Sequence, residues 1–164
     1  MRATLAIVVA ALLAMLFQTT LGALVVPLTD VVPNLVLVLA VFVGLRHHGV
    51  AGVVGAFALG YFLDTFSGTL LGVNAAACMT AYVIAYLISR SLWTEDGLPA
   101  MIVVFLASVA SALVAHGLVL IVDRAWPGWV VVARRGLVQA LLATIATPWL
   151  FGFVRWERRL LRLG

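Results

Sequence analysis

The sequence has no lysine and little charge of either sign: its ten basic side chains are all arginines, and only six residues are acidic. Charged residues make up 10% of the chain, whereas a soluble globular domain carries about 25%. So few charges cannot cover a water-facing surface. Hydrophobic residues reach 65% and the mean hydropathy is +1.23, so the 164 residues are predicted to form one integral membrane domain with no separate soluble enzyme.

Residues for catalysis and metal binding are equally scarce. Cys78 is the only cysteine, so an internal disulfide is excluded, and no metal-ligating partners are near it in the sequence. His47 and His48 have no neighbouring carboxylate or cysteine, and the chain contains no H-E-x-x-H, G-x-S-x-G or phosphate-binding loop motif. No catalytic residue, metal site or cofactor is therefore predicted, and an enzyme is not expected.

Apolar segments of membrane-spanning length organise the chain. A helix needs about 20 apolar residues to cross about 30 Å of hydrocarbon. Segments 3–27, 69–89, 98–122 and 136–155 meet that length, and segments 31–47 and 50–66 form a shorter hairpin around Arg46-His47-His48-Gly49. These boundaries predict an all-α bundle of six transmembrane helices; four spans plus a re-entrant hairpin is the close alternative.

The arginines predict the orientation. With a cytoplasmic N-terminus, the predicted loops place seven arginines inside and three outside, which favours two cytoplasmic termini. The positive tail, residues 155–164, indicates attraction to anionic lipids rather than to nucleic acid. Its arginines share one helical face, as expected of a helix lying at the membrane surface; a stop-transfer anchor is the alternative. They are Arg155, Arg158, Arg159 and Arg162.

In this orientation, five polar side chains from five helices fall in the outer leaflet. They are Gln18, Asp64, Asn74, His116 and Gln139. Intramembrane polar groups must find partners, and ionisable ones are functional candidates. The cluster could hold the bundle together, line a solute-binding cavity open to the outside, or contact a partner protein.

Asp64 ends a stripe of small residues with a four-residue step. Gly52, Ala56 and Gly60 precede it, so the stripe directs the carboxylate towards protein and away from lipid. The chain then turns at Ser67-Gly68, and a new helix begins whose N-terminal N–H groups stabilise an anion. Asp64 is therefore predicted to lock this turn, with Gly72 and Asn74 close by. Asp64→Asn, which keeps one acceptor, is expected to be mild.

Arg134 and Arg135 lie on the outer side, against the positive-inside bias and at the N-terminal end of a predicted helix, where cations are disfavoured. Nearby acids or an acidic patch on an external partner could compensate for them. Trp126 and Trp129 in the same region are typical of an aromatic belt. These four residues are the candidate partner contacts.

The hairpin and the turn after it carry a recognisable motif. It consists of Pro33-Asn34-Leu35, a basic turn at 46–49, the Gly52-to-Asp64 stripe, Ser67-Gly68, and Leu71-Gly72-Val73-Asn74-Ala75. This motif, over residues 31–90, resembles the rod shape-determining protein MreD family, which often has Asp at the position of Asn34. Length and hydropathy extend the resemblance to the whole chain.

The resemblance implies a non-enzymatic inner-membrane component of the bacterial elongation machinery. Such proteins associate with MreC and work beside MreB, RodA and a class B penicillin-binding protein to organise sidewall peptidoglycan synthesis. The implied fold is similar to the substrate-binding subunit of energy-coupling-factor transporters. The alternative function is therefore a small-molecule-binding subunit of a vitamin transporter, which should have an outer cavity lined by Gln18, His116 and Gln139.

Overall fold

The computed structural model describes Gln18 and residues 34–46, 49–67, 70–90, 97–123 and 128–162, and within these ranges helices are joined by short turns and no strand is present. There are five helices in this part of the chain: α2 (Leu35–Arg46), α3 (Val50–Ser67), α4 (Val73–Ser89), α5 (Gly97–Asp123) and α6 (Trp129–Arg162). The expected all-α architecture is therefore confirmed. The first predicted segment, 3–27, lies outside the described residues apart from Gln18, so the count of six spans stays a prediction.

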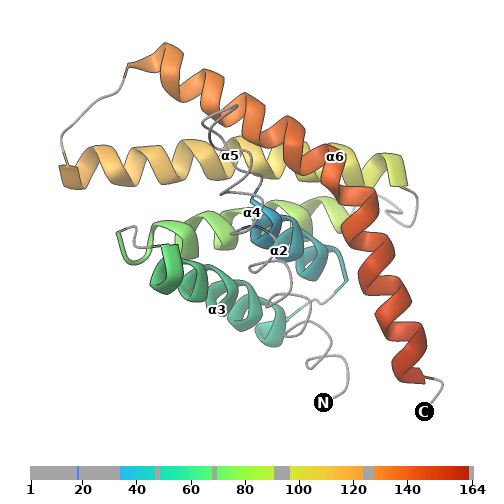
Figure 1. Cartoon of the computed structure of the whole chain (residues 1–164). Helices are drawn as coiled ribbons and strands as arrows, with labels where there is room; N and C mark the ends of the chain where they lie inside the picture. Colours follow the sequence, from blue (N-terminus) through green and yellow to red (C-terminus); the bar gives the residue numbers. More distant parts are fainter. Residues whose placement is uncertain are drawn as a thin grey trace.

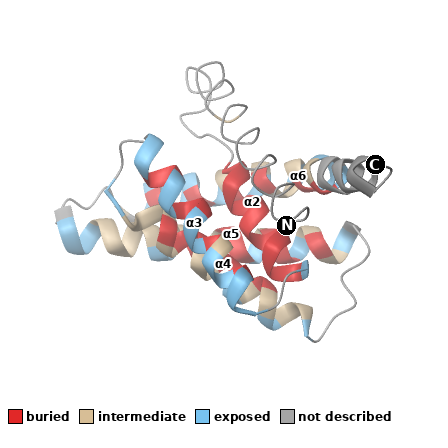
Figure 2. Cartoon of the chain, turned by 90° about the horizontal axis from the view of Figure 1, so that it is seen from below, coloured by how far each residue is buried: buried red, intermediate tan, exposed pale blue. Residues whose placement is uncertain are grey.

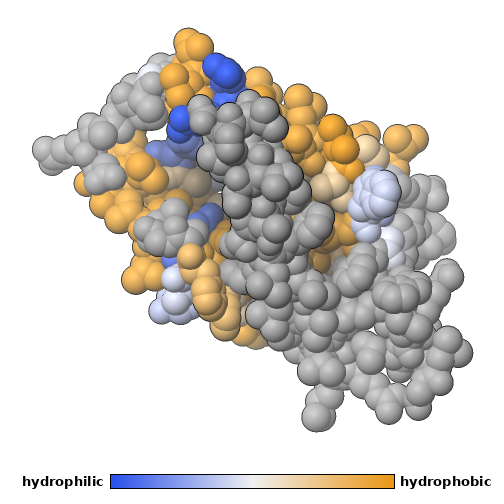
Figure 3. Space-filling model, in the orientation of Figure 1, coloured by the Kyte–Doolittle hydropathy of each residue, from blue (hydrophilic) through white to orange (hydrophobic). Residues whose placement is uncertain are grey.

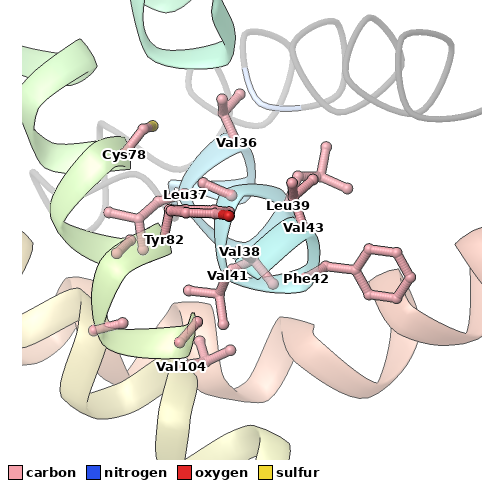
Figure 4. Close-up of a cluster of buried hydrophobic side chains, with 14 of the residues drawn as sticks. Val36, Leu37, Val38, Leu39, Val41, Phe42, Val43, Cys78, Tyr82 and Val104 are labelled. Atoms are coloured by element: carbon pink, nitrogen blue, oxygen red, sulfur yellow. The ribbon is translucent and has the colours of Figure 1, made fainter. Parts of the chain in front are cut away.

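Helix α2 forms the core of the bundle. Its sequence, LVLVLAVFVGLR, is apolar on every side, and every residue from Leu35 to Leu45 is buried. A helix of this kind is stable only when other helices surround it, and α2 contacts α3, α4, α5 and α6 (Figure 2). Figure 4 shows Cys78 and Tyr82 of α4 and Val104 of α5 directed at this helix.

The other helices pack mainly against their neighbours in sequence. Helix α4 lies between α3 and α5, and α6 packs on α5 (Figure 1). Successive helices run in opposite directions, so α2 and α4 end, and α3 and α5 begin, at one end of the bundle. The opposite end holds the C-termini of α3 and α5 and the N-termini of α4 and α6.

Among the five described helices, two are long and apolar enough to cross a membrane by themselves. The candidate spans are Leu98–Val122 within α5, with 25 residues, and Val130–Gly152 within α6, with 23 residues. Helix α2 has 12 residues and is therefore about 18 Å long, shorter than the hydrocarbon layer. The short hairpin expected from the sequence thus consists of α2 and α3.

Three predicted helix boundaries differ from the observed ones. Helix α2 begins at Leu35 rather than 31, after Asn34, whose Oδ1 accepts the N–H of Leu37 at 3.0 Å. Helix α4 begins at Val73 rather than 69, because residues 71–72 form a turn and Gly72 has a φ of 99°. Helix α6 extends from Trp129 to Arg162 rather than over 136–155. Arginines interrupt an apolar pattern without interrupting a helix, which explains the last difference.

Pro148 changes the direction of α6. Proline has no N–H for the carbonyl four residues earlier, here that of Thr144, and its ring crowds that carbonyl, so it kinks a helix. In Figure 1 the final, red part of α6 turns and runs across the direction of α5. Just past the kink, Phe151 packs edge-on against Phe42 of α2, with ring centroids 4.9 Å apart. This contact holds the bent helix against the core.

Candidate functional site: the α3–α4 turn and the outer surface of α6

Asp64 lies at the α3–α4 turn, where its carboxylate binds the N-terminus of α4. The side chain is 1% exposed. One oxygen, Oδ2, accepts the backbone N–H groups of Gly72 at 2.9 Å and Ala75 at 3.1 Å. The other, Oδ1, accepts the backbone N–H and the side-chain Nδ2–H of Asn74, both at 3.0 Å. The carboxylate therefore satisfies N–H groups that the first turn of a helix leaves without partners.

The small-residue stripe of α3 allows this approach. Gly52, Ala56, Gly60 and Asp64 are all buried on one side of the helix. A Cβ at Gly60 would overlap the backbone of Ala75 and lie 2.5 Å from the carbonyl oxygen of Asn74. Only glycine permits two helix backbones to come this close. The stripe thus brings Asp64 within hydrogen-bonding distance of α4.

The N-terminus of α2 is capped in a related way. Asn34 is buried and caps α2 through Leu37, and Oε1 of Gln18 accepts the N–H of Leu35 at 3.1 Å. Asn and Asp both serve as N-caps, so Asn34 can take the capping role that an Asp would have at this position. Sequence reasoning placed Gln18 in a polar cluster and missed its contact with α2, since a separation of 17 residues gives no sequence signal.

The remaining predicted polar residues occupy other places. His116 donates from Nδ1 to the carbonyl of Ala112, 2.7 Å away on the same helix, and both His116 and Gln139 are half-buried. Hydrogen bonds thus bring Asp64 and Asn74 together and attach Gln18 to α2. The gathering of all five side chains in one cluster stays a prediction.

One face of α6 is exposed over its first turns. Arg134 and Arg135 are exposed, and apolar side chains surround them in the helical register. These are Val130 (81% exposed), Val131, Leu137, Leu141 and Ile145. Together with the two arginines they are called the outer α6 surface below. In Figure 3, hydrophilic atoms near the first part of α6 are bordered by hydrophobic surface.

Other candidate residues are placed only by their backbone or not at all. Ser67 ends α3 and Trp129 begins α6, but their side chains are not described. Pro33, Gly68 and Trp126 lie outside the described residues. The tail arginines, Arg155, Arg158, Arg159 and Arg162, follow on the helical backbone of α6. Within the described part of the chain, no group of three or more His, Cys, Asp or Glu residues could hold a metal ion.

The motif on α2, α3 and the α3–α4 turn can now be compared with known families. The family model described as rod shape-determining protein MreD matches residues 1–156, nearly the whole chain. The chain belongs to the MreD family. This family comprises shape-determining membrane proteins and is not a known enzyme family, so the chain is a membrane protein of the rod-shape system. Comparisons with curated proteins and with solved structures gave no match.

The MreD motif has a structural explanation in this chain. Asn34 caps α2, Gly52 and Gly60 lie on the buried side of α3, and Asp64 holds Gly72 and Asn74 at the start of α4. Asn34 and Asp64 therefore each satisfy a helix N-terminus inside the bundle. Asn34, Gly52, Gly60 and Asp64 are buried in the described bundle, whereas Arg134 and Arg135 are exposed on α6.

Proposed function

We propose that this protein serves the rod complex by holding partner proteins in the bacterial inner membrane, and that MreC is its first partner. In this proposal both termini are cytoplasmic, and MreB, RodA and a class B penicillin-binding protein belong to the wider assembly. The protein supplies a binding surface for sidewall peptidoglycan synthesis and no chemistry of its own.

The observation that carries the proposal is the composition of the outer α6 surface. Val130, Arg134, Leu137 and Leu141 follow one another at steps of three and four residues, so they form a continuous exposed row. An apolar row can pack against a partner's membrane helix. Arg134 and Arg135 at its outer end can pair with acids where that partner leaves the membrane. Charges of this kind govern the rate and orientation of docking, while the apolar contact sustains the complex.

The opposite side of α6 is already occupied. Its buried residues, among them Val132, Ala140 and Ala143, belong to the packed interior, where α6 contacts α5 and α2. The exposed row therefore takes no part in the packing of the described bundle. The contacts of the polar residues also favour this function over solute binding, because Gln18 binds the backbone of α2 and His116 binds its own helix.

Co-purification in mild detergent tests the proposal. We expect the double variant Arg134→Glu/Arg135→Glu to capture at least about tenfold less MreC, since each unfavourable charge contact at a docking site costs on the order of a kcal/mol or more. Arg134→Lys/Arg135→Lys keeps both charges and is the matched control. It should retain most of the capture, and high salt should weaken the wild-type complex.

Two results would oppose the proposal. Undiminished capture by the glutamate variant, at wild-type levels of membrane protein, would remove the arginines from the interface. Retention of a vitamin-like molecule by the purified protein, without any protein partner, would favour the small-molecule-binding alternative.

A further inference from the structure

The last part of α6 differs from the rest of the bundle in direction and in charge. The helix has 34 residues and is therefore about 51 Å long, whereas its apolar span, Val130–Gly152, needs only about 34 Å. The backbone continues as a helix for ten residues beyond Gly152, to Arg162. This extension is called the C-terminal helix segment, residues 153–162. Its length takes it outside the hydrocarbon layer unless it changes direction.

The kink at Pro148 provides that change. Beyond it, α6 runs across the direction of α5 at the end of the bundle where α5 begins (Figure 1). Of the two candidate spans in the described part of the chain, the one in α5 is the longer, so we take the direction of α5 as that of the membrane normal. A helix that crosses it at the end of the bundle lies along the membrane surface rather than projecting into water.

Buried side chains lie on both sides of the kink. Before the kink, Thr147 is 1% exposed and its hydroxyl donates to the carbonyl of Ala143 at 2.9 Å. After the kink, Phe151 is 8% exposed and packs on Phe42 of the central helix. The contact of Phe151 with Phe42 therefore holds α6 against α2 just before the C-terminal helix segment begins.

The charge of the segment matches a surface of negative charge. Residues 153–162 contain four arginines and one acid, Glu157. The same end of the bundle includes Arg46, the exposed last residue of α2, and Arg90, which is exposed directly after α4. Four arginines spaced at three, one and three residues share one side of a helix, with Trp156, Leu160 and Leu163 on another in the sequence pattern. This is the pattern of a helix that lies at the boundary between headgroups and hydrocarbon.

We propose that the C-terminal helix segment is a lipid-surface helix that binds anionic phospholipid headgroups through Arg155, Arg158, Arg159 and Arg162. The kink at Pro148 lays the segment on the inner membrane surface, and anionic lipid holds it there. Each arginine near an anionic surface strengthens such binding about fivefold at low salt. This contact is independent of MreC and of the function proposed for the outer α6 surface.

Nitroxide labelling of the purified full-length protein tests the proposal. Leu160→Cys, in a Cys78→Ala background, carries the label, and the protein is reconstituted into vesicles of phosphatidylcholine with or without phosphatidylglycerol. Frequent collisions of the label with oxygen show that it lies in the bilayer. Frequent collisions with a water-soluble nickel chelate show that it lies in water. With phosphatidylglycerol, we expect the label to be shielded from the chelate and accessible to oxygen.

Two matched variants of the four arginines distinguish the effect of their charge from an effect on folding. Replacing the four arginines by glutamine should shift the ratio of surface-bound to free segment by at least about a hundredfold towards water at low salt. Replacing them by lysine keeps the charge and should leave the label at the bilayer. Gel filtration shows that each variant is folded before it is measured.

Either of two outcomes overturns the proposal. One is a label equally exposed to water with and without phosphatidylglycerol, which would leave the arginines for an acidic protein partner. The other is a label that stays in the bilayer in the glutamine variant, because apolar contact alone would then hold the segment.

Discussion

At the scale of single residues, Asp64 shows why a chain this apolar contains a carboxylate at the end of a helix. Its two oxygens accept four N–H groups from Gly72, Asn74 and Ala75, so it acts as the N-terminal cap of a helix to which it does not belong. Asp64 is 1% exposed, so water cannot satisfy these groups, and each one must find a partner within the protein.

This geometry changes the expected effect of Asp64→Asn. The sequence alone predicts a mild effect, since an amide keeps one acceptor. In the structure both oxygens accept, so an amide NH2 would face two N–H donors whichever way it turned. We expect Asp64→Asn to lose about 1–3 kcal/mol, close to the loss in Asp64→Leu.

Thermal unfolding in detergent, followed by circular dichroism, measures this loss. Thr65→Ala is the neighbouring control, because Thr65 is exposed and its hydroxyl only donates to Tyr61 on its own helix. An Asp64→Asn protein that melts with the wild type would show that the cap contributes nothing to stability.

Gly60 offers a second test at the residue scale. A methyl group there would overlap the backbone of Ala75, whereas one at Gly55 of the same helix would have no atom within 4 Å. Gly60→Ala should therefore lower the melting temperature by separating α3 from α4. Gly55→Ala should be neutral or stabilising by up to about 1 kcal/mol, because alanine favours a helix. Equal melting temperatures for the two variants would contradict the close approach at Gly60.

At the scale of helices, α4 and α5 are joined by a hydrogen bond between a side chain and the backbone. The hydroxyl of Ser111 donates to the carbonyl of Ala77 at 2.9 Å, and Ser111 is fully buried. One turn earlier, Ser108 is also buried, and its hydroxyl has no hydrogen-bond partner within the described part of the chain. The two serines therefore make a matched pair on one helix.

We expect Ser111→Ala to cost about 0.6 kcal/mol, the average for such interhelical bonds in a membrane. Ser108→Ala should be neutral or slightly stabilising, because it removes a buried group that lacks a partner. Unfolding in a denaturing detergent compares the two free energies. A larger loss in Ser108→Ala than in Ser111→Ala would contradict the assignment of the bond.

The sequence predicted these helices unevenly, for physical reasons. The hairpin was predictable because Arg46 to Gly49 interrupt an apolar run, and Gly49 has the positive φ of 107° that suits a turn. The beginning of α6 was not, because hydropathy reports the environment of a residue and not its backbone. The kink at Pro148 has a clear sequence signal, but its consequence, the contact of Phe151 with Phe42, depends on tertiary packing.

The part of the candidate site that is formed by residues close together in the sequence was predictable. The stripe and Asp64 follow a four-residue period, and the turn to Asn74 is short in sequence, so their meeting follows from helix geometry. The contact of Gln18 with Leu35 joins separate segments, and no periodic pattern encodes it. The exposure of Arg134 and Arg135 agrees with their charge, but the apolar row beside them becomes visible only when the packed side of α6 is known.

At the scale of the whole molecule, successive helices run in opposite directions, which determines which helix termini lie at the same end of the bundle. The orientation of the bundle in the membrane stays a prediction. Seven arginines fall on the side predicted to be cytoplasmic and three on the other. In a Cys78→Ala background, an impermeant thiol reagent added outside intact cells should label Leu71→Cys at the α3–α4 turn. Val50→Cys and Gly164→Cys should react only after the cells are opened. Labelling of position 164 from outside would overturn the orientation.

The proposed function depends on the outer α6 surface being the partner-binding face of the bundle. Photocrosslinking in living cells tests this claim most directly, with a photoreactive amino acid at Leu137 or Leu141 and, as the control, at Ile102 on the exposed side of α5. We predict crosslinks to MreC from Leu137 and Leu141, weakened by Arg134→Glu/Arg135→Glu, and none from Ile102. Crosslinks to MreC from Ile102 but not from either α6 position would contradict the account.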